Sequence, residues 1–161
     1  MDLLRYLSVC VLLCVIGGCG EQSPQELLAN AEKAAADQAT LDQAVEYYTT
    51  FLQRFAQHEK APVALKQLAA IAQQKGDMQG AIALYERLLA EYPKSEHGDE
   101  AQFMIAFIYE EYLSDAVKAR SAYQLVIDRY PNSELAASAK QLLPNVGRNP
   151  EEWVHFQDKT K

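Results

Sequence analysis

The sequence predicts an all-α protein built as a short solenoid of antiparallel helical hairpins. Three observations support this prediction: one segment recurs at intervals of 37 and 38 residues, apolar residues recur at helical spacing, and glycine or proline stands where helices would end. The chain has 161 residues, 49% of them apolar, which is enough for one small domain with its own core.

The first residues have the layout of a secretory signal. One basic residue, Arg5, precedes an apolar run that breaks at Gly17-Gly18. A membrane-spanning helix needs roughly 20 apolar residues, so the run indicates export more than a permanent span. Cys10, Cys14 and Cys19 are the only cysteines, so no disulfide can form elsewhere in the chain.

The apolar run ends in Ile16-Gly17-Gly18-Cys19, which resembles the lipobox of bacterial lipoproteins. The resemblance implies that residues 1–18 are a lipoprotein signal peptide and that Cys19 is acylated, for example with palmitate. Residues 19–23 would then be a lipidated N-terminus and short tether. Several acyl chains, at about 0.8 kcal/mol per buried methylene, hold a protein durably at a membrane. The alternative is an ordinary signal peptide with an accidental cysteine.

The residue after Cys19 bears on which membrane holds the protein. Gly20 is not the aspartate that resembles an inner-membrane retention signal in enteric bacteria. We therefore expect a lipid anchor in the outer membrane, on its periplasmic face. Anchoring in the inner membrane and secretion into the periplasm are the alternatives.

The first predicted unit begins at Ser23-Pro24-Gln25-Glu26, a capping box with proline at the first helical position. A helix over residues 26–37 is followed by the most degraded copy of the recurring segment, residues 44–59. That copy keeps a small residue and two aromatic residues, Ala44, Tyr48 and Phe55, but has Ala56 where the other copies have proline.

The middle unit is the most regular. Its first helix is predicted over residues 63–75, because Ala64, Leu65, Leu68, Ala69 and Ala72 share one face. A turn at Gly76-Asp77 leads to the recurring segment at residues 81–96, and Pro93 ends the second helix.

The last full unit repeats this plan. A helix over residues 100–113 places Ala101, Gln102, Ile105, Ala106 and Tyr109 on one face, and Ser95 or Asp99 is expected to cap it. A few extra residues, around Tyr112 to Val117, separate it from the recurring segment at residues 119–134, where Pro131 ends the second helix.

A half unit, residues 135–143, is expected to be a helix that solvates the end of the solenoid until Pro144 stops it. The tail, residues 144–161, contains another capping box and two aromatic residues, Trp153 and Phe156. We expect them to cap the solenoid in a short helix. Docking to a partner protein is the alternative role.

Counted from Pro62, the middle unit has small residues at positions 8 and 20, an aromatic at 24 and proline at 32, namely Ala69, Ala81, Tyr85 and Pro93. This pattern resembles the tetratricopeptide repeat. The resemblance implies a short right-handed solenoid of about three units plus capping helices over residues 24–143. With the signal, the chain resembles the BamD-like and YbgF-like families of bacterial envelope lipoproteins, the latter coordinating the Tol-Pal system.

Carrying over the groove positions of the repeat family gives a candidate binding site on the first helices of the last two units. Phenylalanines beside glutamates would form an apolar strip with an acidic edge, suited to an extended peptide or a partner helix with basic residues. Packing of Phe103 and Phe107 against the next unit is the alternative. The site consists of Lys66, Gln73, Gln74, Glu100, Phe103, Phe107, Glu110 and Glu111, and Val63 and Ala70 are further groove positions carried over from the family.

Composition and motifs favour binding over catalysis. A net charge of −7 disfavours nucleic acid, and His58, His97 and His155 have no second ligand at metal-binding spacing. We find no phosphate-binding glycine loop or serine elbow, and adjacent Glu110 and Glu111 point about 100° apart on a helix, so they cannot flank one bond. We predict no enzyme and no cofactor, but a periplasmic adaptor for envelope proteins or peptides. A subunit of a cell-wall-processing complex is the alternative.

Overall fold

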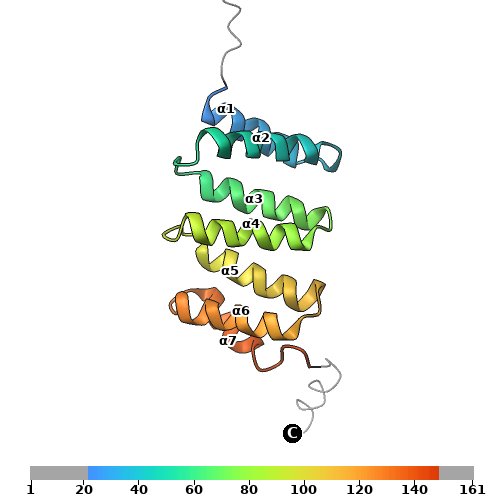
Figure 1. Cartoon of the computed structure of the whole chain (residues 1–161), viewed down its shortest axis with the longest axis vertical. Coiled ribbons are helices and arrows are strands. Elements are labelled where there is room, and N and C mark those ends of the chain that lie inside the picture. The colour runs from blue at the N-terminus through green and yellow to red at the C-terminus, as the bar shows by residue number, and fades with distance from the viewer. Residues whose placement is uncertain (1–21, 149–161) are drawn as a thin grey trace, which may run out of the picture.

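The protein stacks its helices along one axis (Figure 1). A computed structural model describes residues 22–148, which contain helices and turns but no strand, and the predicted all-α fold is confirmed. Trp153, Phe156, His155 and Cys19 lie outside the described residues. The helices are α1 (Pro24–Ala35), the 3-10 turn η1 (Gln38–Thr40), α2 (Leu41–Arg54), α3 (Ala61–Gln74), α4 (Met78–Glu91), α5 (Gly98–Phe107), the π-helical turn η2 (Ile108–Tyr112), α6 (Ala116–Arg129) and α7 (Glu134–Leu142).

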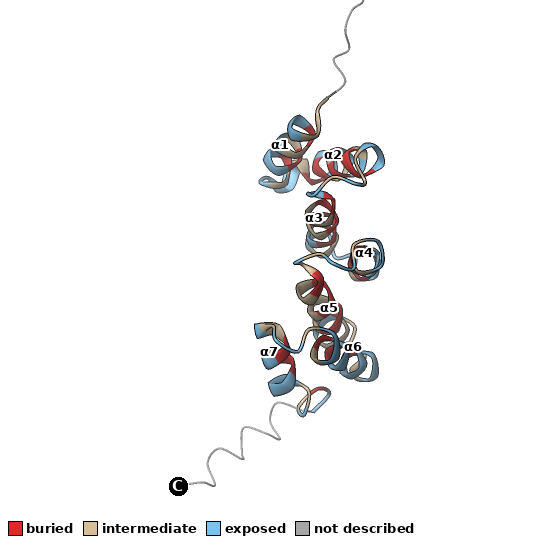
Figure 2. Cartoon of the chain, turned by 90° about the vertical axis from the view of Figure 1, so that its left-hand side faces the viewer, coloured by how far each residue is buried: buried red, intermediate tan, exposed pale blue. Residues whose placement is uncertain are grey.

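The helices form two layers, one of first helices and one of second helices (Figure 2). We call the surface of α1, α3, α5, η2 and α7 the first-helix face, and the surface of α2, α4 and α6 the second-helix face. In Figure 2, α1 and α7 stand further out than α3 and α5, so the first-helix face curves inward. No helix among residues 22–148 is long and apolar enough to cross a membrane.

The core is one continuous cluster that runs through all three units and includes α7. Alanines are fully buried in both helices of each unit, which lets paired helices approach closely, while leucines and aromatic rings fill the space beside them. The shielding of the last unit by α7 agrees with the solvating helix predicted at residues 135–143. The fully buried alanines are Ala31, Ala44, Ala61, Ala64, Ala69, Ala81, Ala101, Ala106, Ala119, Ala136 and Ala139.

Local hydrogen bonds determine where the helices begin and end. The capping box is formed as predicted: Ser23 Oγ accepts from the Glu26 amide at 3.2 Å, and Glu26 Oε2 accepts from the Ser23 amide at 2.8 Å. These hydrogen bonds to Ser23 hold the pKa of Glu26 below its usual value. Gly76 has a φ of 80°, the left-handed conformation that the turn after α3 requires.

The cap predicted for α5 is wrong. The N-cap residue is His97, whose side chain makes no capping bond, and α5 begins two residues earlier than predicted, at Gly98. Ser95 Oγ accepts from the His97 amide at 3.2 Å, and Asp99 Oδ1 accepts from the neighbouring Glu100 amide at 2.8 Å. Neither side chain occupies the N-cap position, because the helix begins between them: Ser95 bonds the N-cap residue and Asp99 bonds the first turn of the helix.

The last unit differs in length from the middle one inside its first helix. Helix α5 starts 37 residues after α3, whereas α6 starts 38 residues after α4. The turn η2 takes up the additional residue, since the Leu113 amide bonds the Ile108 carbonyl, five residues back, at 3.1 Å. The extra residue was predicted near Tyr112 to Val117, in the connection. It lies instead in a π-helical turn that rotates Tyr112 outward, where 54% of its surface is exposed.

One buried tyrosine recurs at the same position of each second helix. Tyr48, Tyr85 and Tyr123 have 2%, 3% and 0% of their surface exposed. The Tyr85 hydroxyl accepts from Gln73 Nε2 at 3.0 Å, and the Tyr123 hydroxyl donates to Glu110 Oε2 at 2.9 Å. Within the described part of the chain, the Tyr48 hydroxyl has no such partner. The first helices of the last two units are thus bonded to their second helices through a tyrosine.

Burial raises the pKa of all three tyrosines. For Tyr48 burial, with a smaller contribution from the charge of Glu32, raises the pKa to about 12. Burial also raises the pKa of Tyr85. For Tyr123 burial is again the main cause, and the hydrogen bond to Glu110 raises the pKa further because that carboxylate stabilises the protonated phenol.

Removing the three tyrosine hydroxyls one at a time should give a ranked series of stabilities. Tyr123→Phe loses a hydrogen bond to a charged acceptor and should cost about 1.5–3 kcal/mol of unfolding free energy, whereas Tyr85→Phe, with a neutral partner, should cost about 1 kcal/mol. Tyr48→Phe is the matched control and should change stability little. Urea denaturation measures all three, and an equal loss in Tyr48→Phe and Tyr123→Phe would contradict the assignment.

Candidate functional site

The eight residues predicted as a groove all lie on α3, α5 and η2, the middle of the first-helix face. The structure divides them into two groups. One group is engaged in bonds that hold the solenoid together, and the other is left open at the surface. Which residue falls into which group depends on contacts between helices.

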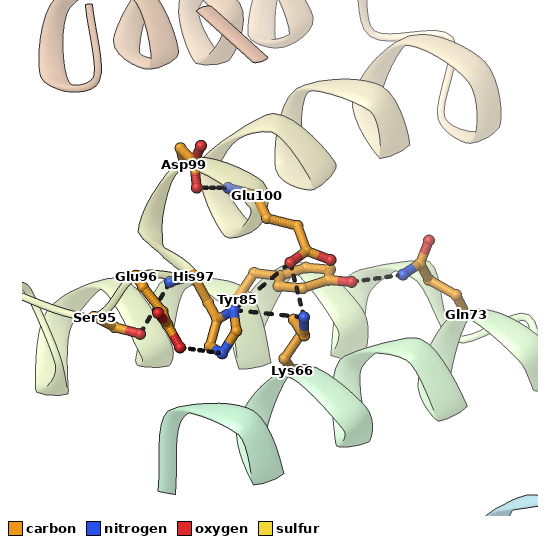
Figure 3. Close-up of polar contacts among 8 residues, drawn as sticks. All are labelled: Lys66, Gln73, Tyr85, Ser95, Glu96, His97, Asp99 and Glu100. Atoms are coloured by element: carbon orange, nitrogen blue, oxygen red, sulfur yellow. Dashed lines mark hydrogen bonds and ion pairs between the residues drawn. The ribbon is translucent and has the colours of Figure 1, made fainter. Parts of the chain in front are cut away.

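Lys66 and Glu100 form an ion pair between the middle and last units (Figure 3). Lys66 Nζ lies 2.8 Å from Glu100 Oε2, and the two side chains are 21% and 44% exposed. His97 lies beside the pair, with Nδ1 3.5 Å from Lys66 Nζ and 3.8 Å from Glu100 Oε2. The ion pair therefore links α3 to the start of α5, and each of the two side chains neutralises much of the other's charge.

Gln73 and Glu110 occupy equivalent positions in the two units, and each bonds the buried tyrosine of its own unit. Figure 3 shows Gln73 reaching from α3 to the Tyr85 hydroxyl of α4. Glu110 makes the corresponding bond from η2 to Tyr123. These two predicted groove residues are therefore positioned by the fold and not left free for a ligand.

The two predicted phenylalanines differ in their surroundings. Phe103 packs against the core of its own unit, where its ring meets Tyr123 edge-on with centroids 5.3 Å apart. Phe107 lies further along the face, its ring centroid 6.0 Å from that of Tyr112. The sequence left open whether both rings face the groove or the next unit. The structure places Phe103 against α6 and Phe107 in a cavity.

That cavity, which we call the last-unit cavity, has a volume of about 600 Å³. Phe107 and Leu142 form an apolar part of the cavity wall. The charged lining residues are Glu110, Glu111 and Arg148. It lies between η2, the start of α6 and the segment that follows α7. An apolar wall with two carboxylates beside it is the chemistry that the sequence predicted for this surface.

A second hollow, which we call the central hollow, has a volume of about 410 Å³ and lies between the end of α1, α3 and η2. Gln74, Ala70 and Tyr112 are among its lining residues. Tyr112 joins the two hollows, because its ring also contacts Phe107 of the last-unit cavity. The open part of the site is therefore Gln74, Phe107, Glu111 and Tyr112, which we call the open patch.

Two residues near the site are not among those that the sequence predicted. Tyr112 was placed among the extra residues near the connection between helices, and His97 was considered only as a metal ligand, although its side chain is just 21% exposed. The one-residue difference in unit length was the signal that could have pointed to Tyr112. Nothing in the sequence marks His97, since its contact with Lys66 joins positions 31 residues apart.

The described part of the site offers groups suited to binding. Within residues 22–148, no group of three or more histidine, cysteine, aspartate or glutamate side chains is placed to hold a metal ion. Glu110 is bonded to Tyr123, while Glu111 is exposed on the same turn. What the surface can do is accept aromatic, aliphatic and basic groups from a ligand.

The sequence of the paired helices matches the model of a known protein family. The Tetratricopeptide repeat family matches residues 64–95 and 100–133, which correspond to the hairpins α3–α4 and α5–α6. Residues 64–95 and 100–133 are therefore similar to tetratricopeptide repeats. Such repeats are protein-interaction modules, and the open patch lies on the helices of the two matched repeats. No curated protein matches the chain.

The contribution of the Lys66–Glu100 pair can be measured with a double-mutant cycle using Lys66→Ala and Glu100→Ala. Because Glu100 is partly exposed, we expect a coupling free energy of about 0.5–1 kcal/mol in low salt. In about 1 M NaCl, where the Debye length falls to about 3 Å, the coupling should shrink. Lys75 and Asp42, a more exposed pair, are the matched control and should couple less. Equal coupling in the two cycles would contradict the expectation that the less exposed Lys66–Glu100 pair is the stronger link between units.

Proposed function

We propose that this protein is a membrane-anchored adaptor of the bacterial periplasm that binds other envelope proteins or peptides through its first-helix face. The observation that carries the proposal is the open patch: an exposed tyrosine, a phenylalanine in a cavity wall and an exposed carboxylate that the fold does not use. These groups lie on tetratricopeptide repeats, whose general role is to hold protein partners.

The chemistry of the open patch specifies the kind of segment it would hold. Phe107 and Tyr112 offer ring faces and edges to apolar side chains, and Glu111 offers a carboxylate to a basic one. The central hollow and the last-unit cavity lie on either side of Tyr112, so an extended segment can place a side chain in each. The acidity of the chain, −7 overall, favours approach of a basic partner.

The lipobox-like sequence supports the membrane anchor in this proposal. With acylated Cys19 as the first residue, four residues precede the capping residue Ser23. At no more than about 3.6 Å per residue, they keep the first unit close to the headgroups. We place the protein in the outer membrane, facing the periplasm, with a role in outer-membrane protein assembly or envelope maintenance.

Variants of the open patch test the binding proposal. A photocrosslinking amino acid at Gln74 should trap a partner in membranes, and Phe107→Ala or Glu111→Lys should lower the yield of that product about tenfold, as loss of an interface anchor does. Val117→Ala is the matched control, because Val117 is also an exposed apolar residue, 77% exposed, but lies on α6. Circular dichroism checks that each variant folds. A hydrolytic activity in the purified protein, with no trapped partner, would contradict the adaptor role.

Replacing the acylated cysteine tests the anchor separately. Cys19→Ala should move the protein from the membrane fraction to the soluble periplasmic fraction, because the acyl chains supply the membrane affinity. Cys14→Ala is the matched control and should leave the distribution unchanged. Unchanged membrane retention of Cys19→Ala would refute lipidation and leave the binding proposal standing.

A further inference from the structure

A groove of about 570 Å³ lies on the opposite side of the molecule, between α4 and α6. Figure 2 shows α5 set back between these two second helices, so α5 forms the floor of this second-helix groove. Ile105 and Tyr109 of α5 and η2 line the floor, Leu89 of α4 one wall and Leu125 of α6 the other. It shares no lining residue with the open patch.

The last unit departs from the middle one at three equivalent positions that line the groove. In α4, Arg87 Nε donates to Glu91 Oε1 at 2.7 Å, so the middle unit pairs its own charges along one helix. The residues 38 positions later in α6 are Leu125 and Arg129. Leu125 is 38% exposed, so an apolar side chain stands where the middle unit has a charged one.

The third difference between the last and the middle unit lies in the floor of the groove. Leu65 of α3 is fully buried, and the equivalent residue of α5, 37 positions later, is Gln102, which is only 3% exposed. Gln102 is the buried polar residue among those described, and its Oε1 accepts a hydrogen bond from Arg129 Nη1 at 3.4 Å. A buried amide therefore turns the Arg129 guanidinium towards the groove.

Arg129 retains most of its binding capacity. A guanidinium has five N–H donors, and within residues 22–148 Arg129 makes this one long hydrogen bond and no ion pair. Lys118, towards the start of α6, is different: its ammonium pairs with Asp115 at 3.3 Å and lies 5.1 Å from the centre of the Tyr109 ring. In the described chain, the groove thus ends in a cation that has no ion pair, beside Gln102 and the apolar side chains of the floor. Glu86 of α4 also lines the groove.

We propose that the second-helix groove binds a segment of a partner protein that presents a carboxylate to Arg129 and an aliphatic side chain between Leu89 and Leu125. Charge complementarity identifies the occupant, because arginine forms paired hydrogen bonds with a carboxylate, and this cation stands out on a chain of net charge −7. The partner is acidic at this point, whereas the open patch suits a basic one. The adaptor therefore has two separate docking surfaces.

Peptide selection tests this proposal with purified protein alone. A phage library of random 12-residue peptides, with a roughly uniform composition, is selected on the full-length protein in detergent and counter-selected on the R129E variant. The enriched peptides should share an acidic residue next to an aliphatic one. No enrichment of such peptides would overturn the proposal.

A synthetic copy of the most enriched peptide then maps the site. Arg129→Glu and Leu125→Asp should each weaken its binding at least about tenfold, and a peptide with lysine in place of its acidic residue should regain affinity for R129E. That charge swap also shows that R129E is folded. Arg87→Ala, at the position equivalent to Leu125 in the middle unit, and Phe107→Ala should leave binding within about twofold.

Three results would overturn the proposal. Binding that survives Arg129→Glu would place the peptide elsewhere, and binding lost in Phe107→Ala would place it on the open patch. Self-association of the protein that disappears in R129E, measured by sedimentation, would assign the groove to a second copy of this chain. Because the assay uses purified protein and Arg129, its failure leaves the adaptor proposal for the open patch untouched.

Discussion

The burial of each helical hairpin against its neighbour is the constraint on which the rest of this molecule depends. A pair of helices joined by a short turn has one apolar face inside the pair and another that only the next pair can cover. Fully buried alanines in both layers let the helices approach closely enough for the three units to share one core. The last unit needs α7 for the same reason, since no further helical hairpin follows it in the described chain.

Polar contacts between helices then decide which surface groups remain for a ligand. Gln73 and Glu110 each bond a buried tyrosine, and Lys66 pairs with Glu100 across two units. Side chains that bond across helices in this way help to fix the angle between the helices, and they are then no longer free to bind a ligand. On the first-helix face, the groups left over are few and concentrated around Tyr112, at the junction of the two hollows.

Both proposed docking surfaces lie where the last unit departs from the regular repeat. On the first-helix face, the extra residue in η2 turns Tyr112 outward beside Phe107. On the second-helix face, Gln102 and Arg129 stand where the middle unit has Leu65 and Glu91. Stacking of the units requires only the regular repeat pattern. Residues that depart from this pattern can therefore form surface features that stacking does not need.

The sequence alone determined the all-α fold, the hairpins, the capping box at Ser23 and the turn at Gly76, because each depends on residues close together in the chain. It indicated which helices form the candidate site but not which of its side chains are free, since Lys66 and Glu100 meet across 34 positions. The position of the extra residue was equally undecided, because a loop or a π-helical turn can take it up. In the tertiary structure the π-helical turn takes it up, and Ile108, at the start of that turn, is fully buried.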